Sequence, residues 1–171
     1  PATADFGTRL LLTRRLIERG VRFVQVYSGG GPLVTQWDAH DDINGNHEKM
    51  CGHVDQPIAA LLQDLKQRGL LQDTLVVWCS EFGRTPRING HIGRDHWPEA
   101  WSLVMTGCGI KRGLAVGETN PEGTWVKSEP FDIGHMFHTW FTALGIDPKK
   151  TEYDNSGQPL PIAHDDCHVV K

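Results

Sequence analysis

The sequence predicts an α/β fold, a three-layer sandwich with a mostly parallel sheet. Short apolar segments rich in β-branched residues alternate with longer segments of helical periodicity. Residues 75–79 form a continuous apolar run, which is typical of a strand buried on both faces. Polar and charged residues follow that run directly, and the carboxyl edge of an open α/β sheet is where ligands bind. These three observations favour one α/β domain with a site at the sheet edge.

The first third of the chain predicts a helix, a strand and a long loop. Residues 6–19 carry leucine and isoleucine at helical spacing, and Gly20 ends the pattern. Residues 21–27 alternate like a strand, and a glycine-rich run interrupts them. The loop that follows carries a dense group of acids and histidine at 37–42.

The remaining two thirds predict further helices and strands. A long helix spans 47–68, where Pro57 predicts a kink or a broken start. The other predicted elements are strands at 75–79, 102–106 and 114–117, the last at an edge, and a helix at 133–144. We expect the strands at 21–27, 75–79 and 102–106 to share one sheet, and residues 1–171 to form a single domain.

Composition excludes several classes of function. The 171 residues are 39% hydrophobic and 22% charged, which is ordinary for a globular protein. The net charge of −4 and the scattered basic residues argue against nucleic acid as a partner. No apolar run reaches the length of a membrane span. The four cysteines form no Cys-x-x-Cys pair, and Cys79, inside a predicted strand, is expected to be a buried free thiol.

Acids and histidines gather at three places along the chain. Asp38 and His40 precede the long helix, Glu81 follows the strand at 75–79, and a glycine-containing loop carries Asp95 and His96. Mixed carboxylate and imidazole ligands suit Zn²⁺ or Mn²⁺, whereas a purely oxygen set favours Ca²⁺ or Mg²⁺. Such an ion stabilises the charge that develops when a phosphate or sulfate ester is cleaved.

A neighbouring arginine adds an anion-binding group to these candidate metal ligands. The planar guanidinium of Arg84 or Arg94 can bind a tetrahedral oxyanion through two hydrogen bonds.

Each group also has a structural interpretation. Asp38 and His40 can cap the loop before the long helix, and Glu81 can pair with Arg84 at the end of a strand. We interpret the other histidines as surface, core or solvated positions: His47, His53, His91, His135, His138, His164 and His168.

Longer motifs resemble a known superfamily. Residues 68–77 followed by S-E-F-G at 80–83 are similar to the C-terminal half of sulfatases and other alkaline-phosphatase-superfamily enzymes, where the equivalent strand ends in S-D-H-G. More narrowly, four segments resemble the domain-of-unknown-function 1501 family: WDAH (37–40), DQPIAALL (55–62), EFGRTP (81–86) and GRDHWP (93–98).

The resemblance implies a metal-dependent hydrolase of phosphate or sulfate esters, acting on a small-molecule or carbohydrate substrate. It implies that this chain is the C-terminal portion of a longer protein and contacts its own N-terminal part, which supplies the nucleophile and one metal-binding Asp. The chain alone is then expected to be inactive. An exported or periplasmic location is favoured, with the cytoplasm left open.

One departure from the superfamily pattern favours an alternative. Phe82 stands where a ligating His or Asn is expected, and its ring cannot bind a metal. The alternative is a non-catalytic, sulfatase-like scaffold with a binding or structural role. A flavodoxin-like nucleotide binder is disfavoured, because no glycine-rich loop lies between an early strand and helix.

These arguments predict one site. We expect Asp38, His40, Glu81 and His96 to bind a divalent metal (Zn²⁺, Mn²⁺, Ca²⁺ or Mg²⁺), with Arg84 and Asp95 as the catalytic residues beside them. If the nucleophile lay in this chain instead, the candidates would be Ser28, Thr35 and Ser80.

Overall fold

The chain forms two compact units, each discontinuous in sequence. The computed structural model describes residues 3–29, 36–149, 152–156, 158–163 and 166–170. The N-terminal unit comprises Pro1–Gln72 and Glu81–Trp101, and the C-terminal unit comprises Asp73–Ser80 and Ser102–Lys171.

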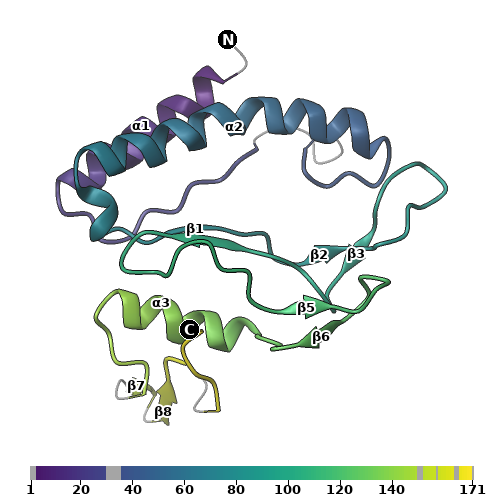
Figure 1. Ribbon diagram of the computed structural model, residues 1–171. Helices are drawn as coiled ribbons and strands as arrows, with labels where there is room; N and C mark the ends of the chain where they lie inside the picture. The colour runs from purple at the N-terminus through teal and green to yellow at the C-terminus, as the bar shows by residue number, and fades with distance from the viewer. Residues whose placement is uncertain (1–2, 30–35, 150–151, 157, 164–165, 171) are drawn as a thin grey trace. The chain divides into compact units, whose positions relative to one another are not determined.

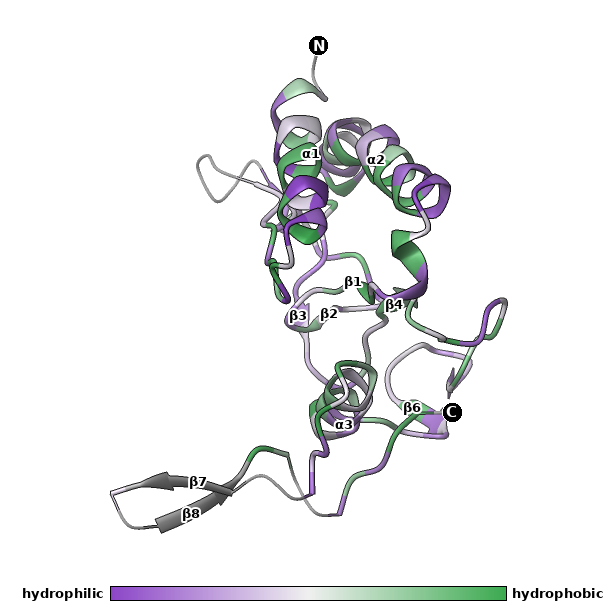
Figure 2. Cartoon of the chain, turned by 90° about the vertical axis from the view of Figure 1, so that its left-hand side faces the viewer, coloured by the Kyte–Doolittle hydropathy of each residue, from purple (hydrophilic) through white to green (hydrophobic). Residues whose placement is uncertain are grey.

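Two long helices dominate the N-terminal unit. Helices α1 (Ala4–Glu18) and α2 (Ile43–Gln67) lie side by side (Figures 1 and 2). Arg14 of α1 is buried and lies 2.8 Å from the Asp64 carboxylate of α2. Arg68 lies 2.7 Å from Asp64 and 3.1 Å from Glu18, so four alternating charges join the two helices. Leucine, methionine and valine side chains of both helices fill the core beneath: Leu10, Met50, Val54 and Leu65.

The predicted helix limits hold with small shifts. Helix α2 begins four residues before the predicted start, where the Asp42 side chain accepts a hydrogen bond from the Gly45 N–H at 3.3 Å. It continues past Pro57, which is buried within it. Gly69, at φ 73°, ends the helix, and the short 3₁₀ helix η2 (Leu70–Gln72) follows. No described helix is both long enough and apolar enough to cross a membrane.

A short antiparallel pair completes the N-terminal unit. Strand β2 (Gly83–Arg84) pairs with β3 (His96–Trp97), with Arg84 opposite His96. A Cβ at Gly83 would lie 2.0 Å from the Ala100 carbonyl oxygen, so only glycine fits this strand position. The pairing therefore brings two of the predicted site residues into register.

The described part of the C-terminal unit holds one helix and three antiparallel pairs. Strand β1 (Val76–Trp78) pairs with β4 (Val104–Thr106), β5 (Glu118–Thr119) with β6 (Val126–Ser128), and β7 (Glu152–Asn155) with β8 (Gln158–Pro161). Helix α3 (Ile133–Ala143) matches the predicted helix and buries His138 and Thr139.

The strands differ from the prediction in two ways. Residues 21–27 and 114–117 are described but form no strand, and Phe23 and Tyr27 are 74% and 71% exposed. Alternation alone does not make a strand, because the backbone also needs a partner to complete its hydrogen bonds. The segments at 75–79 and 102–106 do pair, but antiparallel. No parallel pairing occurs among the described residues, and the three-layer sandwich stays a prediction.

Cys79 also differs from its predicted environment. It follows the end of β1 and is exposed, whereas Cys167, near the end of the chain, is the buried cysteine. Among the described residues β1 and β4 form a two-stranded sheet, so few neighbouring side chains shield Cys79 just beyond its end from solvent.

Candidate metal centre

Two loops of the N-terminal unit dock on each other through their backbones. The Arg94 N–H donates to the Ala39 carbonyl at 3.0 Å, and the Ile43 N–H donates to the Ile92 carbonyl at 3.0 Å. Asp41 and Ile92 form an isolated antiparallel bridge. The loop before α2 is thereby held against the loop before β3, although about fifty residues separate them in the sequence.

The docking requires an unusual backbone at two neighbouring positions. Ile92 has a φ of 62°, a conformation that β-branched residues rarely adopt. A Cβ at Gly93 would lie 2.0 Å from the carbonyl carbon of His40. Only glycine allows this approach, so Gly93 sets how closely His40 and the β3 loop lie together.

Asn89 organises the same loops through its side-chain amide. Its Nδ2 donates to the His40 carbonyl at 3.0 Å and to Asp95 Oδ1 at 3.1 Å. Its Oδ1 accepts from the backbone N–H groups of His91 at 2.9 Å and Gly93 at 3.0 Å. One partly buried side chain thus links both loops. The sequence alone does not reveal this role, since an Asn-Gly pair indicates a turn but not which groups the amide contacts.

Three of the four predicted metal ligands converge. We call Asp38, His40 and His96 the first donor group. Asp38 Oδ1 lies 2.9 Å from His96 Nε2 and 3.1 Å from His40 Nε2, and the two Nε2 atoms lie 3.2 Å apart. Three ligand atoms, two from the loop before α2 and one from β3, therefore lie close together.

The two predicted catalytic residues lie directly beside the first donor group. Asp95 Oδ1 is 2.8 Å from His40 Nδ1, and Arg84 Nη2 is 2.7 Å from Asp38 Oδ1. The other terminal nitrogen of Arg84, Nη1, is buried and has no hydrogen-bond partner among the described residues. Arg84 is thus held against the carboxylate through Nη2, while Nη1 is enclosed by protein atoms.

Electrostatics hold both carboxylates of the site in the ionised form. The hydrogen bond from His96, followed by that from Arg84, lowers the pKa of Asp38 from 3.8 to about 2. The pKa of Asp95 is also lowered, chiefly by the hydrogen bond with His40 and then by that from Asn89. Both aspartates are thus acceptors at neutral pH.

Glu81 and Phe82 do not supply ligand atoms to this group. Glu81, the fourth predicted ligand, is exposed and is not among the grouped donors. The Phe82 ring packs on His96 with 4.3 Å between ring centroids, and the Arg84 guanidinium lies 5.7 Å from the Phe82 ring centroid. Phe82 thus orients two site residues by packing.

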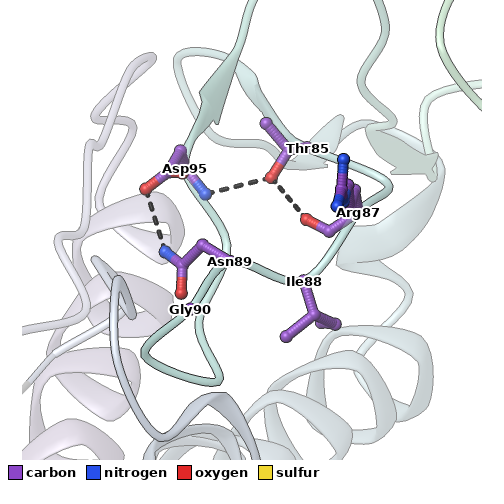
Figure 3. Close-up of a pocket in the computed structure, with 6 residues that line it drawn as sticks. All are labelled: Thr85, Arg87, Ile88, Asn89, Gly90 and Asp95. Atoms are coloured by element: carbon purple, nitrogen blue, oxygen red, sulfur yellow. Dashed lines mark hydrogen bonds between the residues drawn. The ribbon is translucent and has the colours of Figure 1, made fainter.

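A small open pocket adjoins the first donor group. Its volume is about 270 Å³, and it shares Asp95 with the site. Figure 3 shows the hydrogen bonds that join Asn89 to Asp95, Asp95 to Thr85, and Thr85 to the backbone of Arg87. The lining residues are Thr85, Arg87, Ile88, Asn89, Gly90 and Asp95.

Comparison with known proteins places the chain in a family. All of residues 1–171 match the family described as "Protein of unknown function (DUF1501)". The chain belongs to the DUF1501 family. The family named in the sequence analysis is therefore confirmed. No curated protein and no solved structure matches this DUF1501 chain.

The C-terminal unit of this DUF1501 chain contains a further set of potential ligands. Asp132, His135 and Cys167, called the second donor group, offer a carboxylate oxygen, an imidazole nitrogen and a thiol within 4.8 Å of one another. Asp132 is the N-cap of α3 and forms a capping box with His135. The Asp-x-x-His spacing at a helix start could have revealed this pair, but nothing in the sequence connects it to Cys167.

The second donor group has its own electrostatics. Hydrogen bonds from the His135 side chain and backbone lower the pKa of Asp132. Burial, and then the neighbouring Asp132 charge, raise the pKa of the Cys167 thiol.

Proposed function

We propose that this chain provides the metal-binding centre of a hydrolase that cleaves phosphate or sulfate esters, within a sulfatase-like fold of the alkaline phosphatase superfamily. One observation carries the proposal: His40 Nε2 and His96 Nε2 converge on Asp38 Oδ1, while Asp95 binds the other nitrogen of His40. The motifs around Asp38, Glu81 and His96 support it independently.

The chemistry and spacing of the first donor group fit a divalent ion. Two imidazole nitrogens and one carboxylate oxygen suit Zn²⁺ or Mn²⁺ better than Ca²⁺ or Mg²⁺. In a tetrahedral zinc site, nitrogen and oxygen ligands lie about 3.3 Å from one another. The three separations of 2.9, 3.1 and 3.2 Å come near this value.

The neighbouring residues fit the roles that ester cleavage needs. A bound divalent ion would supply Lewis acidity for the charge that develops on the ester oxygens. Asp95 Oδ1 accepts a hydrogen bond from the Nδ1–H of His40, which leaves the lone pair of Nε2 directed at the centre. Arg84 donates from Nη2 to Asp38, and its guanidinium lies beside the centre, where it can bind a tetrahedral oxyanion. The adjoining pocket can receive the rest of a small-molecule or carbohydrate ester.

A second candidate is a scaffold that binds a metal without catalysis. Phe82 favours it, because its apolar ring packs on His96 at the position where the superfamily pattern expects a ligand. The first donor group then has three protein ligands, and the described residues beside it form no second group of three donors.

Calorimetric titration with Zn²⁺ and Mn²⁺ tests the metal centre. We expect His96→Ala to weaken binding at the first donor group by more than about 100-fold, since loss of mere supporting residues already costs 10- to 100-fold. The matched control is His91→Ala, an exposed histidine of the same loop. Equal affinity in wild type and His96→Ala would contradict the proposal.

Anion binding and turnover separate the two candidate functions. The hydrolase predicts that inorganic phosphate or sulfate binds only to the metal-loaded chain and binds more weakly to Arg84→Gln. The scaffold predicts metal binding without either anion. Aryl phosphate or aryl sulfate turnover that a chelator removes would assign the nucleophile to this chain, with Ser28 and Ser80 as described candidates. Thr35, the third candidate, lies outside the described residues.

A further inference from the structure

We propose that Asp132, His135 and Cys167 of the C-terminal unit form a second metal site, which binds a zinc-like ion independently of the first donor group. The three side chains offer one oxygen, one nitrogen and one sulfur atom within 4.8 Å of one another. Each of these three atoms is of a kind that zinc binds in proteins. The site stands on its own geometry and does not depend on the proposed hydrolase function.

The separations are close to those of a tetrahedral site. Cys167 Sγ lies 3.6 Å from Asp132 Oδ1, and His135 Nδ1 lies 2.7 Å from the same oxygen. Ligand atoms around zinc are about 3.3 Å apart for nitrogen and oxygen, and somewhat further apart when one is sulfur. The sulfur already has a suitable position, and the His135–Asp132 pair would open by about 0.6 Å, a small side-chain rotation.

The backbone makes space for the sulfur. A Cβ at Gly134 would lie 2.5 Å from Cys167 Sγ and 3.1 Å from Asp132 Oδ1. The first turn of α3 therefore carries a glycine where the thiol rests. The Val170 N–H donates to Thr139 Oγ1 at 3.0 Å, which fixes the chain after Cys167 along the same helix. The thiol is consequently buried, with 7% of the residue exposed.

Helix capping alone accounts for only part of this arrangement. It explains the contact of Asp132 with His135, and Asp132 accepts the His135 N–H at 3.1 Å. It does not require a thiol against the cap. Nor does it require the second imidazole of His168, whose ring centroid lies 4.8 Å from that of His135. A metal ion would use the three donor atoms at once, and the exposed His168 ring packs edge-on against His135 beside them.

The sulfur ligand also sets which metal this site would take. Thiolates favour zinc and other softer ions over Mg²⁺, Ca²⁺ and Mn²⁺. The first donor group contains only nitrogen and oxygen, so the two sites differ in their selectivity. A probe that reports on sulfur ligation therefore distinguishes them.

Cobalt(II) titration provides that probe, because a cobalt–thiolate bond produces a near-ultraviolet charge-transfer band that nitrogen and oxygen ligands do not. The experiment uses the whole chain with His96→Ala, which removes the first donor group as a competitor. We expect the band to appear, to be abolished by Zn²⁺, and to be absent in His96→Ala/Cys167→Ser. Cys51→Ser, which changes an exposed cysteine of α2, is the control and retains the band.

A second variant guards against loss of folding. Asp132→Asn keeps a side chain that caps helices well but weakens it as a ligand. We expect at least a tenfold loss of cobalt affinity with the helical circular dichroism unchanged. No charge-transfer band in His96→Ala, a band that survives Cys167→Ser, or unchanged affinity in Asp132→Asn would each overturn the second site. None of these outcomes bears on metal binding by Asp38, His40 and His96.

Discussion

The two donor groups are assembled in different ways. In the first, His96 and Asp95 reach Asp38 and His40 across 58 and 55 residues of sequence. In the second, Asp132 and His135 lie three residues apart at the start of one helix, and only Cys167 comes from a distant part of the sequence. The pKa of each aspartate is lowered mainly by a histidine, yet only one of these histidines is a sequence neighbour. The first group therefore depends on loop docking, and the second on a local cap plus one docked thiol.

A substitution at Gly93, which lies against the His40 backbone, tests most directly whether the first donor group depends on loop docking. Gly93→Ala would place a Cβ 2.0 Å from the backbone of His40, which cannot move aside easily. We expect a loss of about 3 kcal/mol in the free energy of unfolding and loss of metal binding at the first donor group. Denaturant unfolding and calorimetry measure both.

The matched controls are Gly90→Ala and Gly134→Ala. No atom lies within 4 Å of a Cβ at Gly90, in the same loop, so stability should be almost unchanged. A Cβ at Gly134 would clash with the Cys167 side chain, which can shift. Alanine in place of glycine also stabilises the helix by up to about 1 kcal/mol. A large loss in Gly90→Ala, or none in Gly93→Ala, would contradict the docking argument.

Two asparagines provide the next comparison, because each organises one loop. Asn89 links the loops of the first donor group, whereas Asn120 accepts from Thr124 and Trp125 within the β5–β6 turn. We expect Asn89→Ala to cost about 2 kcal/mol, since it removes four hydrogen bonds, two of them partly buried. It should also weaken metal binding at the first donor group about tenfold.

Asn120→Ala should destabilise its turn without changing metal affinity at that site. The two variants are compared by denaturant unfolding and by Zn²⁺ titration. Equal effects on Zn²⁺ affinity would show that Asn89 has only a structural role.

Acid titration gives the smallest expected effect. The folded pKa of Asp38 is about 2, below its ordinary 3.8, so its stabilising contribution is present above about pH 4 and is lost as the pH falls toward 2. The pKa of Asp132 is also lowered, so its contribution to stability is likewise lost as the pH falls. Because their side chains are 40% and 69% exposed, solvent screening keeps each contribution below about 1 kcal/mol.

Unfolding of the metal-free chain between pH 2 and 5 measures this contribution. We expect Asp38→Asn to reduce the loss of stability over that range. An unchanged pH profile in Asp38→Asn would show that the ion pairs around Asp38 contribute nothing to folding.

Local patterns predicted the helices well and the strands less well. Helical periodicity and the glycines after each helix located α1, α2 and α3, because these signals act within a few residues. The segment at 21–27 has a strand-like alternation but no ladder, and β1 pairs with β4 antiparallel. Strand pairing joins segments that are far apart in the sequence, and the residues of one segment do not show which other segment it pairs with.

The same contrast between local signals and long-range contacts applies to the candidate site. Acids next to histidines identified Asp38, His40 and His96, and their proximity to Arg84 and Asp95 was also predicted. Glu81 was predicted from a different signal, its position directly after a strand, and it is exposed and outside the group. Asn89, Gly93 and Cys167 were missed because their importance comes from atoms of distant segments.

The sequence by itself determined membership in the DUF1501 family, the helical segments and the chemical kinds of ligand available. Residue type alone sets those properties, since an imidazole or a carboxylate keeps its chemistry in any fold. Only the tertiary structure decided which ligands meet. His40 reaches His96 because Gly93 admits the His40 backbone and Asn89 bridges the two loops. Such convergence rests on contacts between segments far apart in sequence, and these form only when the chain folds.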